Sequence, residues 1–198
     1  MVPVGFMKKV LSLVLISLIV IFAGIKIGGI FRDKRNDNTQ IKNTAVSVTP
    51  FLSEPSRIVI PKINVDANVE SVGLDNKNAM DVPKKVEDTA WYNLGKKPGE
   101  VGNAVIDGHY DTQTGAPAVF YYLSKLSKGD EIIIYAKDGS KKIFKVTEGK
   151  FYPYNTFPIQ YVFGPTNKKR LELITCGGVW DKTSRNYSER FVVSSEME

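Results

Sequence analysis

The chain of 198 residues contains one cysteine, Cys176, and one histidine, His109. A single cysteine cannot form an intramolecular disulfide, so no disulfide framework supports the fold. A structural zinc site with four Cys or His ligands is excluded by the same count. Low-complexity sequence is also lacking, and a hydrophobic content of 42% is typical of an ordered globular domain. Chemistry that needs a thiol or an imidazole must therefore use these two residues.

The C-terminal three quarters of the chain lacks an excess of charge of either sign. The formal net charge is +6, from 27 basic and 21 acidic residues. Residues 1–50 hold 7 of the basic and 2 of the acidic side chains, which leaves 20 basic against 19 acidic in residues 51–198. A nucleic-acid-binding domain concentrates positive charge on its folded surface. We therefore expect no nucleic acid among the partners.

The N-terminal region carries a long apolar segment, residues 10–31, whose one charged residue is Lys26 near its end. A helix of this length spans a hydrocarbon core of about 30 Å, and a terminal lysine can reach the interface. A cleaved signal peptide would need a small-x-small site, which Ala23-Gly24-Ile25 does not supply. We predict a membrane anchor at residues 1–32, with the span at about 10–31, in contact with membrane lipid. A cleaved signal peptide and a buried core helix are the alternatives, and the Lys and Arg counts leave the orientation open.

Polar residues 33–55 follow this segment and are interpreted as a flexible tether. Residues 56–198 then form the predicted folded domain, in which short runs rich in Ile, Val, Tyr and Phe alternate with turn residues. The predicted strands are Arg57–Ile60, Asn68–Val72, Asn103–Asp107, Glu131–Lys137, Lys141–Glu148, Arg170–Cys176 and Arg190–Ser194. Asp138-Gly139 predicts a tight hairpin, and Val119–Leu126 is compatible with one short helix. The pattern predicts an all-β sandwich or barrel, without deciding between them.

The two rare residues each come at the end of an apolar run. Cys176 closes the run Leu171–Cys176 and precedes Gly177-Gly178, while His109 follows Ala104–Gly108. Catalytic groups gather where strands give way to loops on a rigid sheet, so both positions favour a site at a sheet rim. The alternatives are a buried thiol that acts as a small hydrophobe and an imidazole without a role.

Together the two residue types suit nucleophilic catalysis. A thiol becomes a nucleophile when it is deprotonated, and an imidazole within reach can donate a proton to a departing amine. The developing oxyanion needs a positively charged donor. Arg190, predicted to begin a strand, and Arg185, in the preceding loop, are both candidates at this point.

These residues resemble the sortase family of cysteine transpeptidases over roughly Arg57–Val193. The stretches that carry the resemblance, in order, are Gly108–Asp111, Leu173–Cys176 and Arg190–Val193, and the opening Ile58–Ile63 is similar as well. Gly177-Gly178, with Phe157-Pro158 upstream, resembles class F most closely. One departure is Glu172, which stands where the family signature usually has threonine.

The resemblance implies an eight-stranded sortase-type β-barrel with one or two short helices, preceded by an N-terminal transmembrane helix. It implies a single-pass protein of the cell membrane with an extracellular catalytic domain. Its substrates would be LPxTG-type sorting-signal peptides of secreted proteins, cleaved at the Thr–Gly bond through a thioester. The acyl group would pass to a cell-wall precursor or another amine acceptor.

In this reading Cys176 is the nucleophile, His109 the proton donor and acceptor, and Arg190 the residue that positions the substrate and the oxyanion. We predict no metal and no cofactor, because no compact carboxylate cluster stands out. Papain-like hydrolases place Cys before His, and L,D-transpeptidases resemble one another in a His-Gly-Cys stretch, so both fit poorly. The alternative from another class is a non-catalytic, membrane-anchored β-domain, either an adhesin or a binding module.

Overall fold

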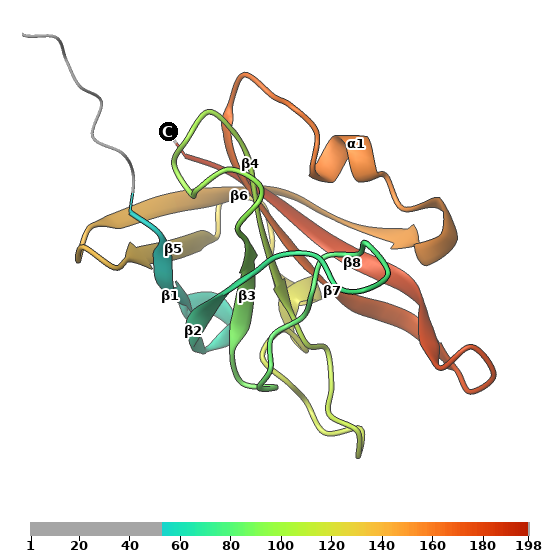
Figure 1. Ribbon diagram of the computed structural model, residues 1–198. Coiled ribbons are helices and arrows are strands. Elements are labelled where there is room, and N and C mark those ends of the chain that lie inside the picture. The colour runs from blue at the N-terminus through green and yellow to red at the C-terminus, as the bar shows by residue number, and fades with distance from the viewer. Residues whose placement is uncertain (1–52, 198) are drawn as a thin grey trace, which may run out of the picture. The chain divides into compact units, whose positions relative to one another are not determined.

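Eight strands close into a barrel in the computed structural model, which describes residues 53–197 (Figure 1). The strands are β1 Pro55–Ile60, β2 Val65–Val72, β3 Thr89–Tyr92, β4 Gly102–Gly108, β5 Glu131–Ala136, β6 Lys141–Pro153, β7 Lys169–Asp181 and β8 Asn186–Glu196. They follow the order β1-β2-β3-β4-β7-β8-β6-β5 around the barrel, and β5 pairs with β1 to close it. The prediction of an eight-stranded barrel is confirmed, and the sandwich is ruled out.

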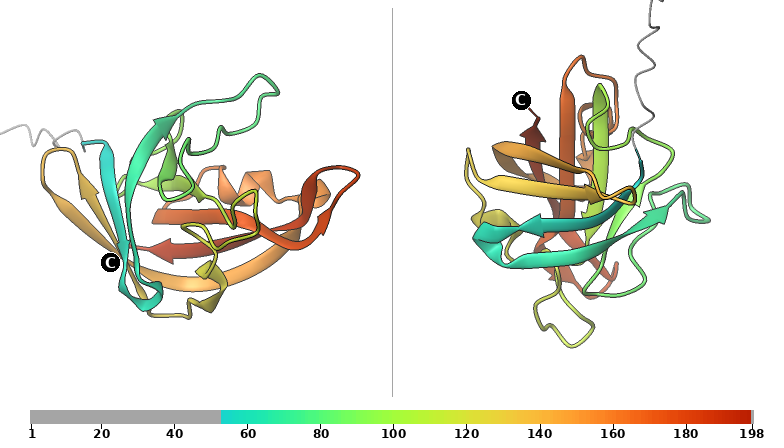
Figure 2. Two further views of the ribbon diagram at one scale, coloured as in Figure 1. Left: turned by 90° about the horizontal axis from the view of Figure 1, so that it is seen from below. Right: turned by 90° about the vertical axis from the view of Figure 1, so that its left-hand side faces the viewer.

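Two of the strand pairs are parallel, β2 with β3 and β4 with β7, and the other six are antiparallel. The β4–β7 pair joins segments that are more than sixty positions apart in the sequence. It places the end of β4 beside the middle of β7, which brings His109 to the same region as Cys176. The β7–β8 hairpin extends beyond the neighbouring strands (Figure 2).

The short elements differ from the sequence prediction. Strand β3 was not predicted, because four residues are too few to show an alternating pattern. The expected helix at Val119–Leu126 is wrong, since that segment forms turns and one 3-10 helix at Leu123–Lys125. One short α-helix, α1 Ile159–Val162, follows β6 instead, and 3-10 helices occupy Pro61–Ile63 and Tyr154–Thr156.

The N-terminal anchor predicted at residues 1–32, and almost all of the tether predicted at residues 33–55, lie outside the described residues. Within residues 53–197, no helix has both the length and the apolar character to cross a membrane.

The barrel interior is filled by alternate residues of the strands and by side chains of the segment between β4 and β5. Large side chains with no exposed surface include Phe120, Phe144, Ile106, Leu171 and Leu173. Burying a side chain of this kind contributes about 1.5–3 kcal/mol relative to leaving it in water. The close packing of the interior therefore holds β4, β7 and β8 rigidly in place.

A second apolar cluster lies on the outer face of the same three strands. Val105 on β4, Ile174 on β7 and Val192 on β8 alternate with the inward-facing residues and contact Val162 of α1. Residues 154–168, called here the covering segment, contribute Phe157 and Phe163 to this cluster. Figure 1 shows α1 on the outside of the barrel. The outer face of β4, β7 and β8 is thus a covered surface rather than a solvated one.

Candidate active site

Cys176 lies within β7 and not at its end. The strand continues to Asp181, and the register with β8 shifts between Gly177 and Trp180. The sequence prediction that the strand stops at Cys176 is therefore wrong. The irregularity begins after Gly177 and includes Gly178, and it bends the strand next to the thiol. Cys176 is half-buried and forms no disulfide.

Arg190 lies directly across from Cys176 on the antiparallel strand β8, as its Cα partner. Strand β8 begins at Asn186, so Arg190 sits four residues inside the strand and does not begin it as predicted. Its guanidinium Nη1 donates to the carbonyl oxygen of Glu189 at 2.9 Å, and Nη2 donates to Asn186 Oδ1 at 2.8 Å. These bonds orient the guanidinium from its own strand.

Arg185, the second candidate arginine, lies in the turn of the β7–β8 hairpin. It is exposed, and its φ of 52° is in the left-handed region typical of a tight turn. It does not line the cleft that contains Cys176. The geometry thus favours Arg190 over Arg185 as the arginine beside the thiol.

His109 follows β4 directly, and the chain around it is held by several contacts. Its Nε2–H donates to the carbonyl oxygen of Pro83 at 2.9 Å, which leaves Nδ1 to exchange a proton. Thr175 Oγ1 donates to the carbonyl oxygen of Gly108 at 2.7 Å and so ties the end of β4 to β7. A Cβ at Gly108 would lie 2.5 Å from the ring of Phe120, so this close approach requires glycine. Local contacts therefore fix the position from which the imidazole projects.

One cleft with a volume of about 420 Å³ contains all three predicted catalytic residues. Its polar lining consists of Asp75, Asp107, His109, Tyr154, Cys176 and Arg190. Its apolar lining comes from Ala79, Met80 and Val82 before β3, from Phe157 and Phe163 of the covering segment, and from Ile174. A thiol, an imidazole and a guanidinium thus share a surface that also offers an apolar wall.

The thiol is held in its neutral form at rest. Burial raises the pKa of Cys176, and the positive charge of Arg190 opposes that rise only in part. The carboxylates of Asp107 and Asp111 add to the rise in the pKa of the thiol. Ionisation therefore requires a partner that takes the proton, which is the role an imidazole can fill.

Asp107 is a member of the cleft that the sequence analysis did not single out. Burial raises its pKa to about 6, while the charges of His109 and Arg190 act in the opposite direction. The available signal was its position near the end of a predicted strand, two residues before His109.

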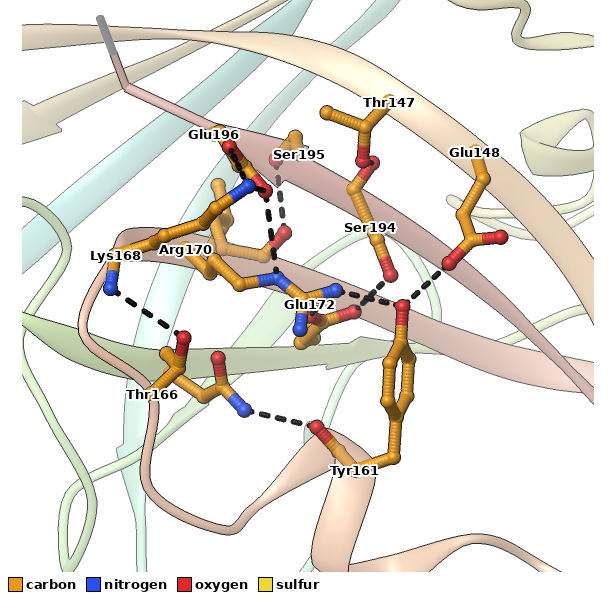
Figure 3. A network of polar contacts seen from close by, with 12 residues as sticks. Thr147, Glu148, Tyr161, Thr166, Lys168, Arg170, Glu172, Ser194, Ser195 and Glu196 are labelled. Carbon is orange, nitrogen blue, oxygen red and sulfur yellow. Dashed lines mark hydrogen bonds and ion pairs between the residues drawn. The ribbon is translucent and has the colours of Figure 1, made fainter.

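A buried polar network lies further along the same outer face (Figure 3). Glu172 has no exposed surface, accepts a hydrogen bond from Ser194 Oγ at 2.6 Å, and pairs with Arg170 Nη2 at 2.9 Å. Arg170 also donates to the hydroxyl of Tyr161 at 2.8 Å, and that hydroxyl donates to Glu148. Tyr161 belongs to α1, so the network holds the covering segment against the barrel. Glu172, the departure from the family signature, is thus an internal anchor of this segment.

Burial raises the pKa of Glu172 to about 7, although Ser194 and Arg170 act to lower it.

Asn103 on β4 also supports the covering segment, because its Nδ2 donates to the carbonyl oxygens of Tyr161 and Gly164 at 2.9 and 3.1 Å. The apolar wall of the cleft therefore depends on polar contacts at its far side.

No group of three or more His, Cys, Asp or Glu side chains that could hold a metal ion occurs within residues 53–197. The predicted absence of a metal and of a cofactor stays a prediction.

Comparison with known proteins decides the family. A family model described as the sortase domain matches residues 58–198. The chain belongs to the sortase family. Sortases are cysteine transpeptidases, so the predicted family and enzyme class are confirmed, and a non-catalytic β-domain is not favoured. A search of curated proteins found no match.

Solved sortase structures share the fold of this sortase. Sortase C-1 from Actinomyces oris is 21% identical with a TM-score of 0.57, over 72% of this chain and 73% of that one. Sortase C1 of Streptococcus agalactiae, in complex with MTSET, is 19% identical with a TM-score of 0.56, over 72% and 68%. Sortase A from Corynebacterium diphtheriae is 20% identical with a TM-score of 0.54, over 73% of this chain and 60% of that one. These structures belong to classes A and C.

Proposed function

We propose that this sortase cleaves an LPxTG-type sorting signal of secreted proteins at the Thr–Gly bond and transfers the acyl group to a cell-wall amine. The observation that carries the proposal is the opposition of Cys176 and Arg190 on β7 and β8, in one cleft with His109. The family membership supports the substrate class, and the apolar wall offers a surface for an uncharged peptide segment.

In the first half-reaction the Cys176 proton passes to His109 and the sulfur attacks the threonine carbonyl carbon. A C–S bond forms, and the carbonyl electron pair moves to oxygen, where the Arg190 guanidinium stabilises the negative charge. Collapse of this intermediate breaks the C–N bond, and His109 gives its proton to the departing glycine amine. The product is a thioester on Cys176.

In the second half-reaction an amine attacks the thioester carbonyl. A C–N bond forms, His109 takes the proton of the incoming amine, and the C–S bond breaks to release the Cys176 thiolate, to which His109 returns that proton. Water can replace the amine, which makes hydrolysis the side reaction. Arg190 serves both half-reactions, because the oxyanion forms at the same place in each.

The test is cleavage of an LPxTG-type peptide by the purified 198-residue chain, with release of the glycine-containing fragment as the readout. Cys176→Ala should abolish release and leave the circular dichroism spectrum and the unfolding midpoint close to wild type. Addition of an amine such as triglycine should convert the hydrolysis product into a transpeptidation product. Turnover by the Cys176→Ala variant at the wild-type rate would refute the proposal.

We also propose that this sortase belongs to class F. The proposal rests on Gly177-Gly178 after Cys176 and on Phe157-Pro158 in the covering segment. A crystal structure superposed on domains of classes A, C and F should place both segments nearest the class F backbone. A nearer match to class A or class C would overturn the assignment.

Residues 1–32 are proposed to anchor the protein in the cell membrane as a single span, with the catalytic domain outside. The uncharged stretch before Lys26 supports the span, and the family membership supports the orientation. The chain should remain in the membrane pellet after alkaline carbonate extraction, and external protease should digest the domain on intact protoplasts. Release by carbonate, or protection from protease, would contradict this part of the proposal.

A further inference from the structure

Asp107 is an acidic side chain of the cleft to which the proposed reaction gives no role. It lies on β4, one residue before the strand ends at Gly108 and two residues before His109, which follows the strand. Its Cα partner on β7 is Ile174, which lies two residues before Cys176. Asp107, His109, Cys176 and Arg190 all line the same cleft. The carboxylate therefore shares one cleft with every group in the proposed chemistry.

The carboxylate of Asp107 has no close counter-ion. Within residues 53–197 no side chain donates a hydrogen bond to it or forms a salt bridge with it, and the backbone N–H of Gly108 is its hydrogen-bond partner. This contrasts with Glu172 further along the same face, whose oxygens are engaged by Arg170 and Ser194. The negative charge of Asp107 therefore acts on the cleft, because no ion pair within the described part of the fold neutralises it.

The charged groups that face this cleft can be named element by element. His109 follows Asp107 on β4, Arg190 contributes a cation from β8, and Cys176 contributes the titrating thiol from β7. Asp75 lines the cleft from the segment between β2 and β3, and its carboxylate accepts the backbone N–H groups of Lys77 and Ala79.

Two further groups complete this set. Tyr154 lines the cleft from the segment after β6. Asp111 follows β4, and its carboxylate accepts a hydrogen bond from the hydroxyl of Tyr187. Asp107 differs from Asp75 and Asp111 because, among the described residues, its carboxylate accepts no hydrogen bond from the backbone of a turn or from a tyrosine hydroxyl.

We propose that Asp107 is a positioning residue whose negative charge sets the protonation balance between Cys176 and His109. The inference rests on the proposed function of the site and adds a fourth residue to it. A negative charge beside an imidazole favours the imidazolium, and the same charge beside a thiol disfavours the thiolate. Asp107 therefore favours the neutral thiol of Cys176 in the resting enzyme and stabilises the imidazolium that forms when His109 takes the thiol proton. The imidazolium is then available as the acid that the departing amine needs, and the resting thiol is shielded from oxidation.

The chain offers an unusually clean test, because it contains one histidine and one cysteine. The His109 ring titration can be followed in the full-length protein by the C2–H proton signal, without assignment by mutation. The Cys176 titration can be followed by the rate of iodoacetamide alkylation against pH. Asp107→Asn removes the charge and keeps the shape of the side chain, and Asp107→Glu restores the charge. Glu131→Gln on β5 is the matched control, because it removes one negative charge from a strand that pairs only with β1 and β6.

In Asp107→Asn both midpoints should move to lower pH by about 0.5–1 unit, the scale of one charge at short range in a partly buried site. Asp107→Glu and Glu131→Gln should both titrate like wild type. Both limbs of the pH–rate profile for peptide cleavage should move in the same direction as the midpoints. Should Asp107→Asn fail to fold, Asp107→Ser removes the same charge.

Midpoints that stay in place in Asp107→Asn, or that move in opposite directions, would overturn the inference. A shift of equal size in Glu131→Gln would also overturn it, because the effect would then be one of net charge. The titrations of His109 and Cys176 need no substrate peptide, so they do not depend on cleavage. A chain that shows both shifts but cleaves no sorting signal would reject the proposed function and support the role of Asp107.

Discussion

Cys176 and Arg190 are opposed residues on two antiparallel strands, and their side chains leave the sheet on the same face. Opposed residues of this kind have Cβ atoms about 4.5–5.5 Å apart, a spacing set by the backbone ladder. The guanidinium is further oriented by Glu189 and Asn186 of its own strand. The sheet itself thus places a cation beside the thiol, with no contribution from a mobile loop.

This arrangement predicts unequal effects for the two arginines of the hairpin. Arg190→Ala should lower kcat/KM for peptide cleavage by about 10²–10³, the usual loss for an oxyanion donor. Arg185→Ala should leave kcat/KM close to wild type, because Arg185 lies in the exposed turn. Steady-state kinetics of the two variants provide the measurement, and thermal unfolding checks that both are folded. A large loss in Arg185→Ala with a small one in Arg190→Ala would reverse the assignment.

The network around Tyr161 predicts an effect on substrate binding. Tyr161→Phe removes the hydroxyl that accepts from Arg170 and donates to Glu148, which loosens α1 and the apolar wall beside it. KM should rise about two- to tenfold, corresponding to the net value of about one hydrogen bond, while kcat changes little. Tyr135→Phe on β5 is the control, because Tyr135 lies on a strand outside the cleft. A fall in kcat at unchanged KM would instead place Tyr161 in the chemistry.

Glu172 predicts an unusual dependence of stability on pH. Its pKa in the folded protein is about 7, above the ordinary value of 4.5, so at intermediate pH the folded state holds a proton that the unfolded state has released. The free energy of unfolding should therefore fall as pH rises from about 4.5 to about 7, by up to about 3 kcal/mol. Denaturant unfolding between pH 4.5 and 8 measures the slope. Glu172→Gln, which cannot titrate, should remove this contribution, and an identical slope in both proteins would contradict it.

Gly178 predicts a steric requirement next to the nucleophile. Its φ is +76°, and a Cβ there would lie 2.3 Å from Ser188 Oγ and 2.8 Å from Glu189 Oε2. Gly139 has a similar φ of +81° in the β5–β6 turn but open space around it. Gly139→Ala should cost about 1–2 kcal/mol from the backbone alone, and Gly178→Ala about 1–3 kcal/mol more. Chemical denaturation of the two variants compares them, and equal losses would show that the contact with Ser188 relaxes freely.

The strands of this barrel could be predicted where the sequence runs are long and apolar. All seven predicted runs coincide with strands, but β3 escaped prediction because Thr89–Tyr92 is too short to show a period. Closure of the barrel depends on the pairing of β1 with β5, which no local pattern encodes. The barrel was therefore predictable from the family resemblance and not from the alternation of residues.

The residues of the site, like the strands, could be predicted only in part. The scarcity of Cys and His pointed to Cys176 and His109, and the cleft brings both together. Asp107 was missed because an acidic residue near the end of a strand is normally solvated, and only its register with Ile174 turns it toward the thiol. Gly177-Gly178 was interpreted as the end of a strand, whereas paired glycines can equally form a bulge within one.

The route by which the site is assembled follows from the connectivity of β4, β7 and β8. Cys176 and Arg190 belong to one hairpin and are brought together by a short turn, whereas His109 arrives through a parallel pairing with a distant segment. Pairing between distant segments carries the larger entropic cost of loop closure and is slower to form. When the complete chain folds, the thiol should therefore meet its cation before its imidazole. The chain should therefore stay inactive until β4 has paired with β7, which delays attack on a peptide bond until a late step of folding.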